Sequence, residues 1–248
     1  MTLPVPPPGR HPAVRGLVAV VGVAAAPRHA MHECGDVVHV VDRPDGGACV
    51  IVADGQGHGR GARIIATMAV TMIAGLVGEG VREDAALVAA NDRLLAHRGG
   101  QVSCEAVAVV IDPVDGVVRV SRFARSAAHF LGDDERAVTG GEAPPLGVYR
   151  GAAPASDVVP VSLSLACLVT SDGVRTAGGR VGRALDLASS LARAARLGGD
   201  RAAHAILGEA IGADDGRPRD DMAVACITFE PLNPDLTFRR MSARVPLS

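Results

Sequence analysis

The sequence predicts an α+β fold, a four-layer α-β-β-α sandwich in which two antiparallel sheets are flanked by helix pairs. Short apolar runs rich in β-branched residues, typical of strands, alternate with pairs of longer runs in which apolar residues recur at helical spacing. This order of strands and paired helices is typical of helix layers packed outside two sheets. The 248 residues suffice for one domain, and no linker tract divides them.

The expected elements are separated by recognisable turns. Asp45-Gly46-Gly47 is a hairpin sequence, the segment 112–116 is a turn between two strands, and Gly198-Gly199 is expected to stop a helix. The expected strands are 17–25, 37–41, 48–53, 105–111, 117–123, 127–131, 157–161, 165–170 and 222–229. The expected helices begin near residue 61 and near residue 87, and span residues 181–197 and 201–211.

The domain is expected at residues 16–229, between two ends of different composition. Residues 1–15 contain prolines at positions 4, 6, 7, 8 and 12, which oppose a regular element, so we expect an extended or disordered lead-in. Residues 230–248 show no apolar periodicity after Pro231 and are expected to form a tail that is disordered or docks elsewhere.

Composition and charge disfavour several partners and reactions. The formal net charge of -2 leaves no basic stripe, so neither nucleic acid nor a membrane surface is an expected partner. The apolar stretch 16–27 is too short to span a bilayer and the N-terminus lacks the order of a signal peptide, so we expect a soluble, cytoplasmic protein. Five cysteines, an odd number, are expected to be reduced core residues. The absence of lysine disfavours phosphate-loop nucleotidases, protein kinases and Schiff-base chemistry.

The glycine-rich segment 53–59 places a carboxylate, Asp54, at the exit of an apolar strand. Gly55, Gly57 and Gly59 allow positive φ and a close approach of the backbone to a ligand. The same turn opens a helix whose N-terminus favours anions. Asp54 is therefore a candidate for chemistry at a strand end, provided that other segments supply partners.

Asp36, Asp172 and Asp220 also lie at the edges of expected strands, each beside glycine or another acid. If those strands are neighbours, these three residues converge on Asp54, and their mutual repulsion favours divalent cations among them. Ligands that are all oxygen select magnesium or manganese, and a carboxylate that bridges two such ions is suited to phosphoryl hydrolysis.

Four segments together resemble the metal-dependent protein phosphatases of the 2C (PPM) superfamily. Within it, the sequence is most similar to the bacterial branch typified by the stage II sporulation protein E phosphatase domain and the regulators of stress sigma factors. The four segments occur in matching order over residues 16–229: Cys34-Gly35-Asp36, Asp54-Gly55-Gln56-Gly57-His58-Gly59, Thr170-Ser171-Asp172-Gly173-Val174 and Asp220-Asp221-Met222-Ala223-Val224.

The resemblance implies a protein serine/threonine phosphatase that uses two Mn2+ or Mg2+ ions. Its substrate would be a phosphoserine or phosphothreonine on a bacterial regulatory protein, such as an anti-sigma-factor antagonist or a stress-signalling scaffold. Asp54 would bridge the ions, with the Gly55 carbonyl on one of them. Asp172 and Asp220 would complete the first ion's ligands, and Asp36 would serve the second. The water between the ions would be the nucleophile, and an activating partner is one source of control.

Two departures from this family, and four further residues, bear on the site. His39 stands where many relatives have another acid, and the segment 122–129 stands where relatives often carry Asn-Ala-Gly-His, so the substrate-facing loop is expected to differ. Four residues are candidates for supporting roles. His58 would be a hydrogen-bonding group or a general acid, and Asp221 could exchange roles with Asp220. Arg122 and Arg125 would receive substrate phosphate or lie on a solvated strand face.

Two other functions remain open from the residues alone. A module of the same fold could bind metal or a partner without turnover, if the altered segment 122–129 has lost activity. A nucleotide-binding protein that uses the glycine-rich turn is a weaker alternative because lysine is missing. Manganese-dependent hydrolysis of p-nitrophenyl phosphate, stopped by a chelator, separates the enzyme from the binding module.

Overall fold

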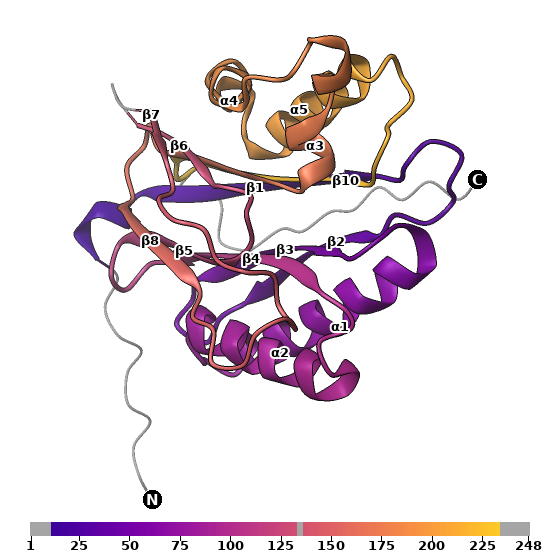
Figure 1. Cartoon of the computed structure of the whole chain (residues 1–248). Coiled ribbons are helices and arrows are strands. Elements are labelled where there is room, and N and C mark those ends of the chain that lie inside the picture. The colour runs from indigo at the N-terminus through magenta and orange to yellow at the C-terminus, as the bar shows by residue number, and fades with distance from the viewer. Residues whose placement is uncertain (1–10, 133–135, 234–248) are drawn as a thin grey trace, which may run out of the picture.

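Two five-stranded antiparallel sheets face each other, with helices on both outer sides (Figure 1). The computed structural model describes residues 11–132 and 136–233. Sheet A contains, in spatial order, β1 (Leu17–Ala26), β10 (Met222–Pro231), β9 (Ala166–Thr170), β6 (His129–Leu131) and β7 (Arg136–Val138). Sheet B contains β2 (Asp36–Asp42), β3 (Ala48–Gly55), β4 (Cys104–Asp112), β5 (Val117–Phe123) and β8 (Ala155–Pro160). The predicted fold class is confirmed.

The outer layers are helical, and each covers one sheet (Figure 1). Sheet B is covered by α1 (Gly59–Gly78) and α2 (Glu83–Arg98). Sheet A is covered by α3 (Asp172–Thr176), α4 (Leu187–Ala194) and α5 (Gly199–Ala213). Three 3-10 turns complete the described elements: η1 (Pro12–Val14), η2 (Gly179–Val181) and η3 (Ala195–Leu197).

The central strands are buried on both faces, which explains their continuous apolar sequences. In β3, Val50 and Val52 pack between the two sheets, whereas Cys49, Ile51 and Ala53 pack against α1 and α2. Successive side chains of a strand point to opposite faces, so a strand covered on both sides needs apolar residues throughout. The same alternation in β10 divides its side chains between the inter-sheet layer and the layer under α3, α4 and α5.

Two helical segments differ from the sequence prediction. The helix expected at 181–197 is shorter, because Gly182 adopts a φ of 70° and α4 begins only after Asp186, whose side chain accepts a bond from the Ser189 amide. Gly198, with a φ of 83°, ends η3 and separates the two helical segments as predicted, but α5 already begins at Gly199 and not at residue 201. Strand β7 was not expected, and its three residues are too short to show periodicity.

The two ends differ in part from expectation. Residues 12–14 form η1, so the expected lack of a regular element is wrong there; a proline fits the first turn because it needs no amide donor. Residues 1–10 of the predicted lead-in lie outside the described residues. Strand β10 continues to Pro231, and most of the predicted tail, residues 234–248, also lies outside them.

The apolar helix α1 and the cysteines are core features. By length and composition, α1 is the one helix within the described parts of the chain that could cross a membrane, with a mean hydropathy of 1.6. Its buried side chains, Ala66 and Ile73 among them, pack against sheet B. All five cysteines are free thiols. Four of them are buried core residues as predicted, whereas Cys34 is only half-buried.

Gly22 should be essential for the packing of α5 on β1. A Cβ atom at Gly22 would lie 1.9 Å from the Gly199 carbonyl oxygen, so Gly22→Ala forces backbone apart. We expect the free energy of unfolding, measured by urea denaturation, to fall by roughly 3 kcal/mol. The matched control is Gly75→Ala, on an exposed part of α1 where nothing lies within 4 Å, which should raise stability by about 0.5–1 kcal/mol. Equal effects of the two substitutions would contradict this account.

Candidate metal centre

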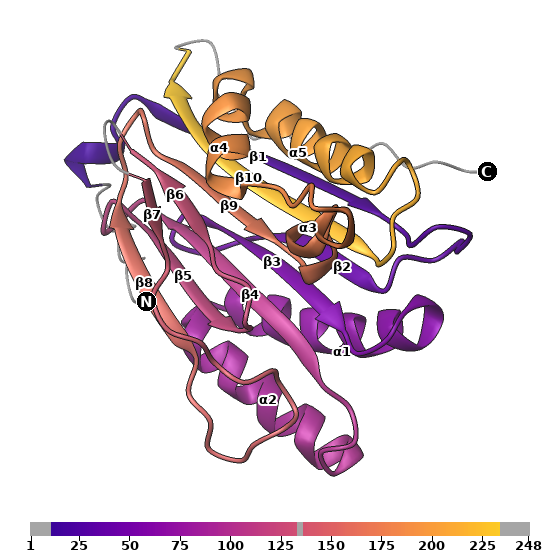
Figure 2. The same ribbon diagram turned by 45° about the horizontal axis from the view of Figure 1, so that its top comes forward.

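Three carboxylates form a row across β2, β3 and β4 of sheet B. These three strands lie side by side (Figure 2). Asp36 on β2 is paired with Asp54 on β3, and Asp54 is paired in turn with Glu105 on β4. Paired residues share a sheet face with Cβ atoms about 4.5–5.5 Å apart. Asp54 and Glu105 have the strand parity of Val52 and Val107, which pack between the sheets, so the row lies at one end of the inter-sheet layer.

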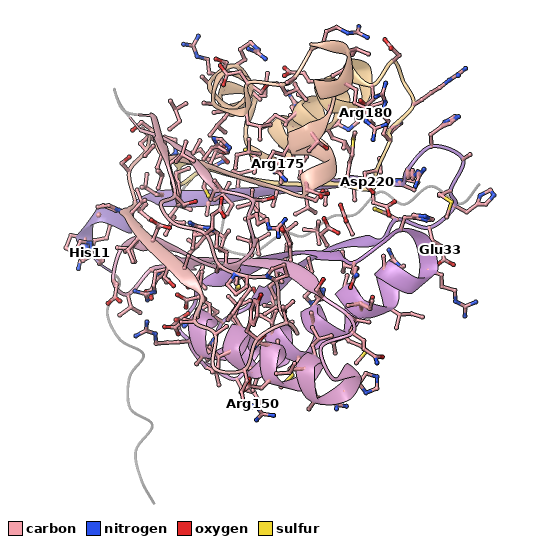
Figure 3. The ribbon with its side chains drawn as sticks, in the orientation of Figure 1. His11, Glu33, Arg150, Arg175, Arg180 and Asp220 are labelled. Carbon is pink, nitrogen blue, oxygen red and sulfur yellow. The ribbon has the colours of Figure 1, made fainter. Side chains whose placement is uncertain are left out.

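Sheet A brings further carboxylates to the same end of the sandwich. Asp172 is the first residue of α3, directly after Ser171, and Asp220 and Asp221 directly precede β10. The two segments are joined because the Ser171 amide donates to the Ala223 carbonyl at 3.0 Å and the Ser171 hydroxyl accepts from the Ala223 amide at 2.9 Å. Figure 3 shows Asp220 at the end of the sandwich, on the same side as Glu33.

The carboxylates of the two sheets lie close enough to act on one another electrostatically. The charge of Asp172 acts on both Asp36 and Asp54, and the charges of Asp220 and Asp221 also act on Asp36. The predicted aspartates of sheets A and B are therefore neighbours at one end of the sandwich.

The carboxylates are held where ionisation is unfavourable. Burial, followed by the charges of Asp36 and Asp172, raises the pKa of Asp54 to about 10. Burial is also the main cause that raises the pKa of Asp36 to about 7. The nearby Ser171 side chain opposes this rise, and the charges of Asp221, Asp172 and Asp220 add to it. Partial burial and the neighbouring acids raise the pKa of Asp220 as well.

These groups fit divalent cations by charge and chemistry. One oxygen of Asp36, Oδ2, is buried and has no hydrogen-bond partner, in a residue that is only 3% exposed. Such an oxygen needs a partner, and a cation would supply one while neutralising the neighbouring acids. The donors are all oxygen, which suits Mg2+ or Mn2+. Within residues 11–132 and 136–233, no three His, Cys, Asp or Glu side chains already stand in a metal-holding arrangement, so the fit lies in charge and donor type.

The motif glycines serve mainly to bring backbone segments close together. A Cβ atom at Gly55 would lie 2.0 Å from the Ala62 carbonyl oxygen of α1, and one at Gly173 would lie 2.0 Å from the Asp221 carbonyl oxygen. Gly57 and Gly59 adopt φ values of 97° and 65°, as the sequence predicted. The turn after Asp54 is therefore tight because α1 packs directly on the end of β3.

Asp221 anchors the start of α1. Its Oδ1 accepts a bond from the Arg28 amide at 2.9 Å, and its Oδ2 accepts one from the Gly59 amide at 3.4 Å. The anion expected at the helix N-terminus is thus a carboxylate of the chain itself. With both oxygens of Asp221 engaged, Asp220 is the freer of the two acids; its Oδ1 accepts a bond from the Asp221 amide at 2.9 Å.

The family model described as stage II sporulation protein E (SpoIIE) matches residues 44–230. The chain belongs to the SpoIIE family. No curated protein sequence matches it. Among solved structures, it is similar to the PP2C phosphatase domain with a fragment of the regulatory domain of SpoIIE from Bacillus subtilis, with a TM-score of 0.72 and 14% identity. The match covers 88% of this chain and 65% of that one, so the chain spans slightly less than two thirds of that structure.

Two further structures have the same fold as this SpoIIE-family chain. The catalytic domain of the serine/threonine protein phosphatase PstP, in complex with two manganese ions, gives a TM-score of 0.67 at 16% identity and covers 86% of this chain and 99% of that one. RsbX in complex with magnesium gives a TM-score of 0.66 at 13% identity, and the match covers 86% of this chain and 96% of that one. At these identities the likeness shows the fold.

Three other predicted site residues of this SpoIIE-family chain make no hydrogen bond or ion pair with the site carboxylates. Arg122 is fully buried and donates to Asp157 Oδ2 at 2.7 Å and to the Gly141 carbonyl at 2.8 Å, so the expectation of a phosphate-binding or solvated side chain is wrong. Arg125 is exposed and makes no hydrogen bond or ion pair with a described residue. His58 precedes α1 with an exposed side chain that makes no capping bond, and its role stays a prediction.

Sequence reasoning missed Glu105 and Arg28. Glu105 was placed at the start of a strand, but only the register of β3 with β4 sets it opposite Asp54. Its Oε2 also lies 3.5 Å from the Ser126 hydroxyl, in the segment that departs from the family. Arg28 lies near Asp220 and its positive charge acts to lower the pKa of that acid, opposing burial. The strand pairing was the signal that could have located Glu105.

Replacing Asp221 should lower the free energy of unfolding more than replacing an exposed residue nearby. Asp221→Ala leaves the Arg28 and Gly59 amides without their acceptor at a site that is 3% exposed. We expect chemical denaturation to show that the free energy of unfolding falls by about 2 kcal/mol. The control is Glu33→Ala, on the exposed β1–β2 connection, which should change stability by less than about 0.5 kcal/mol. A similar small change for Asp221→Ala would show that it does not anchor α1.

The metal-free protein should lose stability as pH rises from about 4 to about 7. Over this range the unfolded chain gives up the Asp36 and Asp54 protons while the folded chain keeps them, so the folded state binds more protons. The stabilisation is complete below the unfolded pKa and is lost as pH rises through the folded pKa. We expect Tm in EDTA to be several degrees lower near pH 7 than near pH 5, with a smaller difference in Asp36→Asn.

Added Mn2+ provides the companion measurement. Because the ion binds deprotonated carboxylates, it should raise Tm more near pH 7 than near pH 5. A metal-free Tm that rises over this pH range, or that responds equally in wild type and Asp36→Asn, would contradict the buried-carboxylate account.

Proposed function

We propose that this chain is a metal-dependent protein serine/threonine phosphatase. The observation that carries the proposal is the convergence of buried and half-buried carboxylates from two sheets, with an unpartnered Asp36 oxygen and with Asp172 close enough to Asp54 for its charge to act on that acid. Membership of the SpoIIE family and the fold shared with PP2C phosphatases support the same activity. PstP with two manganese ions and RsbX with magnesium support divalent ions as cofactors.

The proposed ligands are Asp54, the Gly55 carbonyl, Asp172 and Asp220 for one ion, and Asp54 with Asp36 for the other. When bound, the two ions would lower the pKa of a water to make a nucleophile and neutralise charge on the phosphoryl group. The chain's own residues orient this set. The Ser171 hydroxyl accepts from the Ala223 amide and so ties the start of α3, which carries Asp172, to β10. Asp221 fixes the start of α1 against the loop that carries Arg28.

The substrate we propose is a phosphoserine or phosphothreonine on a bacterial regulatory protein in the cytoplasm. An anti-sigma-factor antagonist or a stress-signalling scaffold would fit, and a structure of similar fold whose description concerns the bacterial stressosome supports that class. An activating partner belongs to the same proposal. The non-catalytic alternative is less well supported, because the four aspartates are present and Arg122, in the altered segment, packs as a core residue.

Hydrolysis of a phosphoserine peptide with added Mn2+ tests the proposal. We expect Asp172→Asn to lower kcat/KM by more than about 100-fold, since loss of a ligand should exceed the 10–100-fold cost of removing an outer partner. The matched control is Asp115→Asn, in the β4–β5 turn at the other end of sheet B, whose side chain is 59% exposed. Its activity should stay near wild type.

The outcomes separate three accounts. Metal-dependent hydrolysis that fails in Asp172→Asn supports the phosphatase. Manganese binding measured by calorimetry without hydrolysis points to the non-catalytic module or to an enzyme that needs its activating partner. A folded protein that neither binds Mn2+ nor hydrolyses the peptide would overturn the proposal.

A further inference from the structure

We propose that a basic groove beside Asp220 binds acidic side chains that flank the phosphorylated residue of the protein substrate. The proposal rests on the phosphatase function proposed above and adds a substrate class to it. We define the basic groove by the charged residues that line it, which are Arg28, Arg180, Arg217, Arg219, Asp214, Asp215 and Asp220.

The basic groove is built from three chain segments that meet at the end of sheet A. Arg28 comes from the β1–β2 connection, Arg180 from η2, and Arg217 and Arg219 from the connection between α5 and β10. Its volume is about 870 Å³. Figure 3 shows Arg180 and Asp220 on the same side of the molecule, with Arg180 on the helical layer over sheet A. Cavities of about 300–1,000 Å³ hold ligands of drug size, so there is room for several side chains beyond one phosphoryl group.

Most of the negative charge in the groove is already engaged by the fold. Asp214 is buried and accepts bonds from the Gly178 amide at 2.9 Å and the Arg219 amide at 3.1 Å. Asp215 forms an ion pair with Arg183 at 2.6 Å. These two acids hold the loop in place and are not free to neutralise the other arginines.

Three arginines of the groove remain available to a ligand. Arg28, Arg180 and Arg217 are exposed, and none forms an ion pair with a carboxylate of the described residues. Four arginines against three aspartates give the groove a small positive balance in a chain whose net charge is -2. Guanidinium groups bind carboxylates and phosphates through paired hydrogen bonds, so the groove fits an anionic peptide better than a neutral or basic one.

Position links the groove to the chemistry. Arg28 and Asp220 line the same groove, and Asp220 is a proposed metal ligand. A phosphorylated residue at the metal centre would therefore place its neighbours along the groove, towards Arg180 and Arg217. Basic walls beside a reactive site also raise the local concentration of an anionic substrate, in a manner that salt weakens.

The test compares phosphoserine peptides with acidic, neutral or basic flanks. At low ionic strength with Mn2+, we expect the peptide with aspartates on one side of the phosphoserine to exceed its asparagine counterpart roughly tenfold in kcat/KM. The Arg180→Gln/Arg217→Gln double variant should reduce that ratio to near one. Arg180→Glu/Arg217→Glu should prefer the basic flank instead. The control is Arg150→Gln, an exposed arginine far from Asp220 (Figure 3), which should keep the wild-type ratio.

A second readout does not depend on turnover. Fluorescence anisotropy in EDTA measures binding of the acidic peptide without its phosphate, and the double glutamine variant should weaken it roughly tenfold relative to wild type and to Arg150→Gln. Equal kcat/KM values for acidic and neutral peptides, or an acidic preference that survives in the double variant, would overturn the groove proposal. Failure of p-nitrophenyl phosphate hydrolysis would instead count against the phosphatase, while the anisotropy result still decides whether the groove binds acidic segments.

Discussion

Repulsion between carboxylates brought together from two sheets is the constraint on which this structure depends. Sheet B contributes Asp36, Asp54 and Glu105 by strand pairing, and Asp172 reaches them from the end of sheet A. Without a cation the folded chain relieves the repulsion by retaining protons, which is why burial and mutual charge raise the pKa values of Asp36 and Asp54. A divalent ion would neutralise the carboxylates in place of those protons, and the ionised oxygens would coordinate the ion.

The surrounding fold keeps these acids close in spite of that cost. Gly55 and Gly173 let backbone segments touch where any side chain would force them apart. Asp221 joins the β1–β2 connection to the start of α1, so both sheets are tied together at the end that carries the carboxylates. The extensive apolar layers supply the stability that offsets this local repulsion between carboxylates.

Sequence reasoning was most informative where one pattern had one structural cause. Strands buried on both faces gave continuous apolar runs, and the glycine-rich turn after Asp54 marked the start of α1. It failed where tertiary packing decided: the burial of Arg122 depends on Asp157, and the position of Glu105 depends on register. The metal ligands were predicted from four separate segments and the family that they resemble, and their assignment remains a proposal.

Crystals grown with Mn2+, with anomalous diffraction recorded at the manganese edge, test the central claim most directly. We predict two manganese peaks between the ends of the two sheets, with Asp54 between them and Asp36, Asp172 and Asp220 as further ligands. Peaks only elsewhere on the molecule, or none in crystals of protein saturated with Mn2+, would contradict the account.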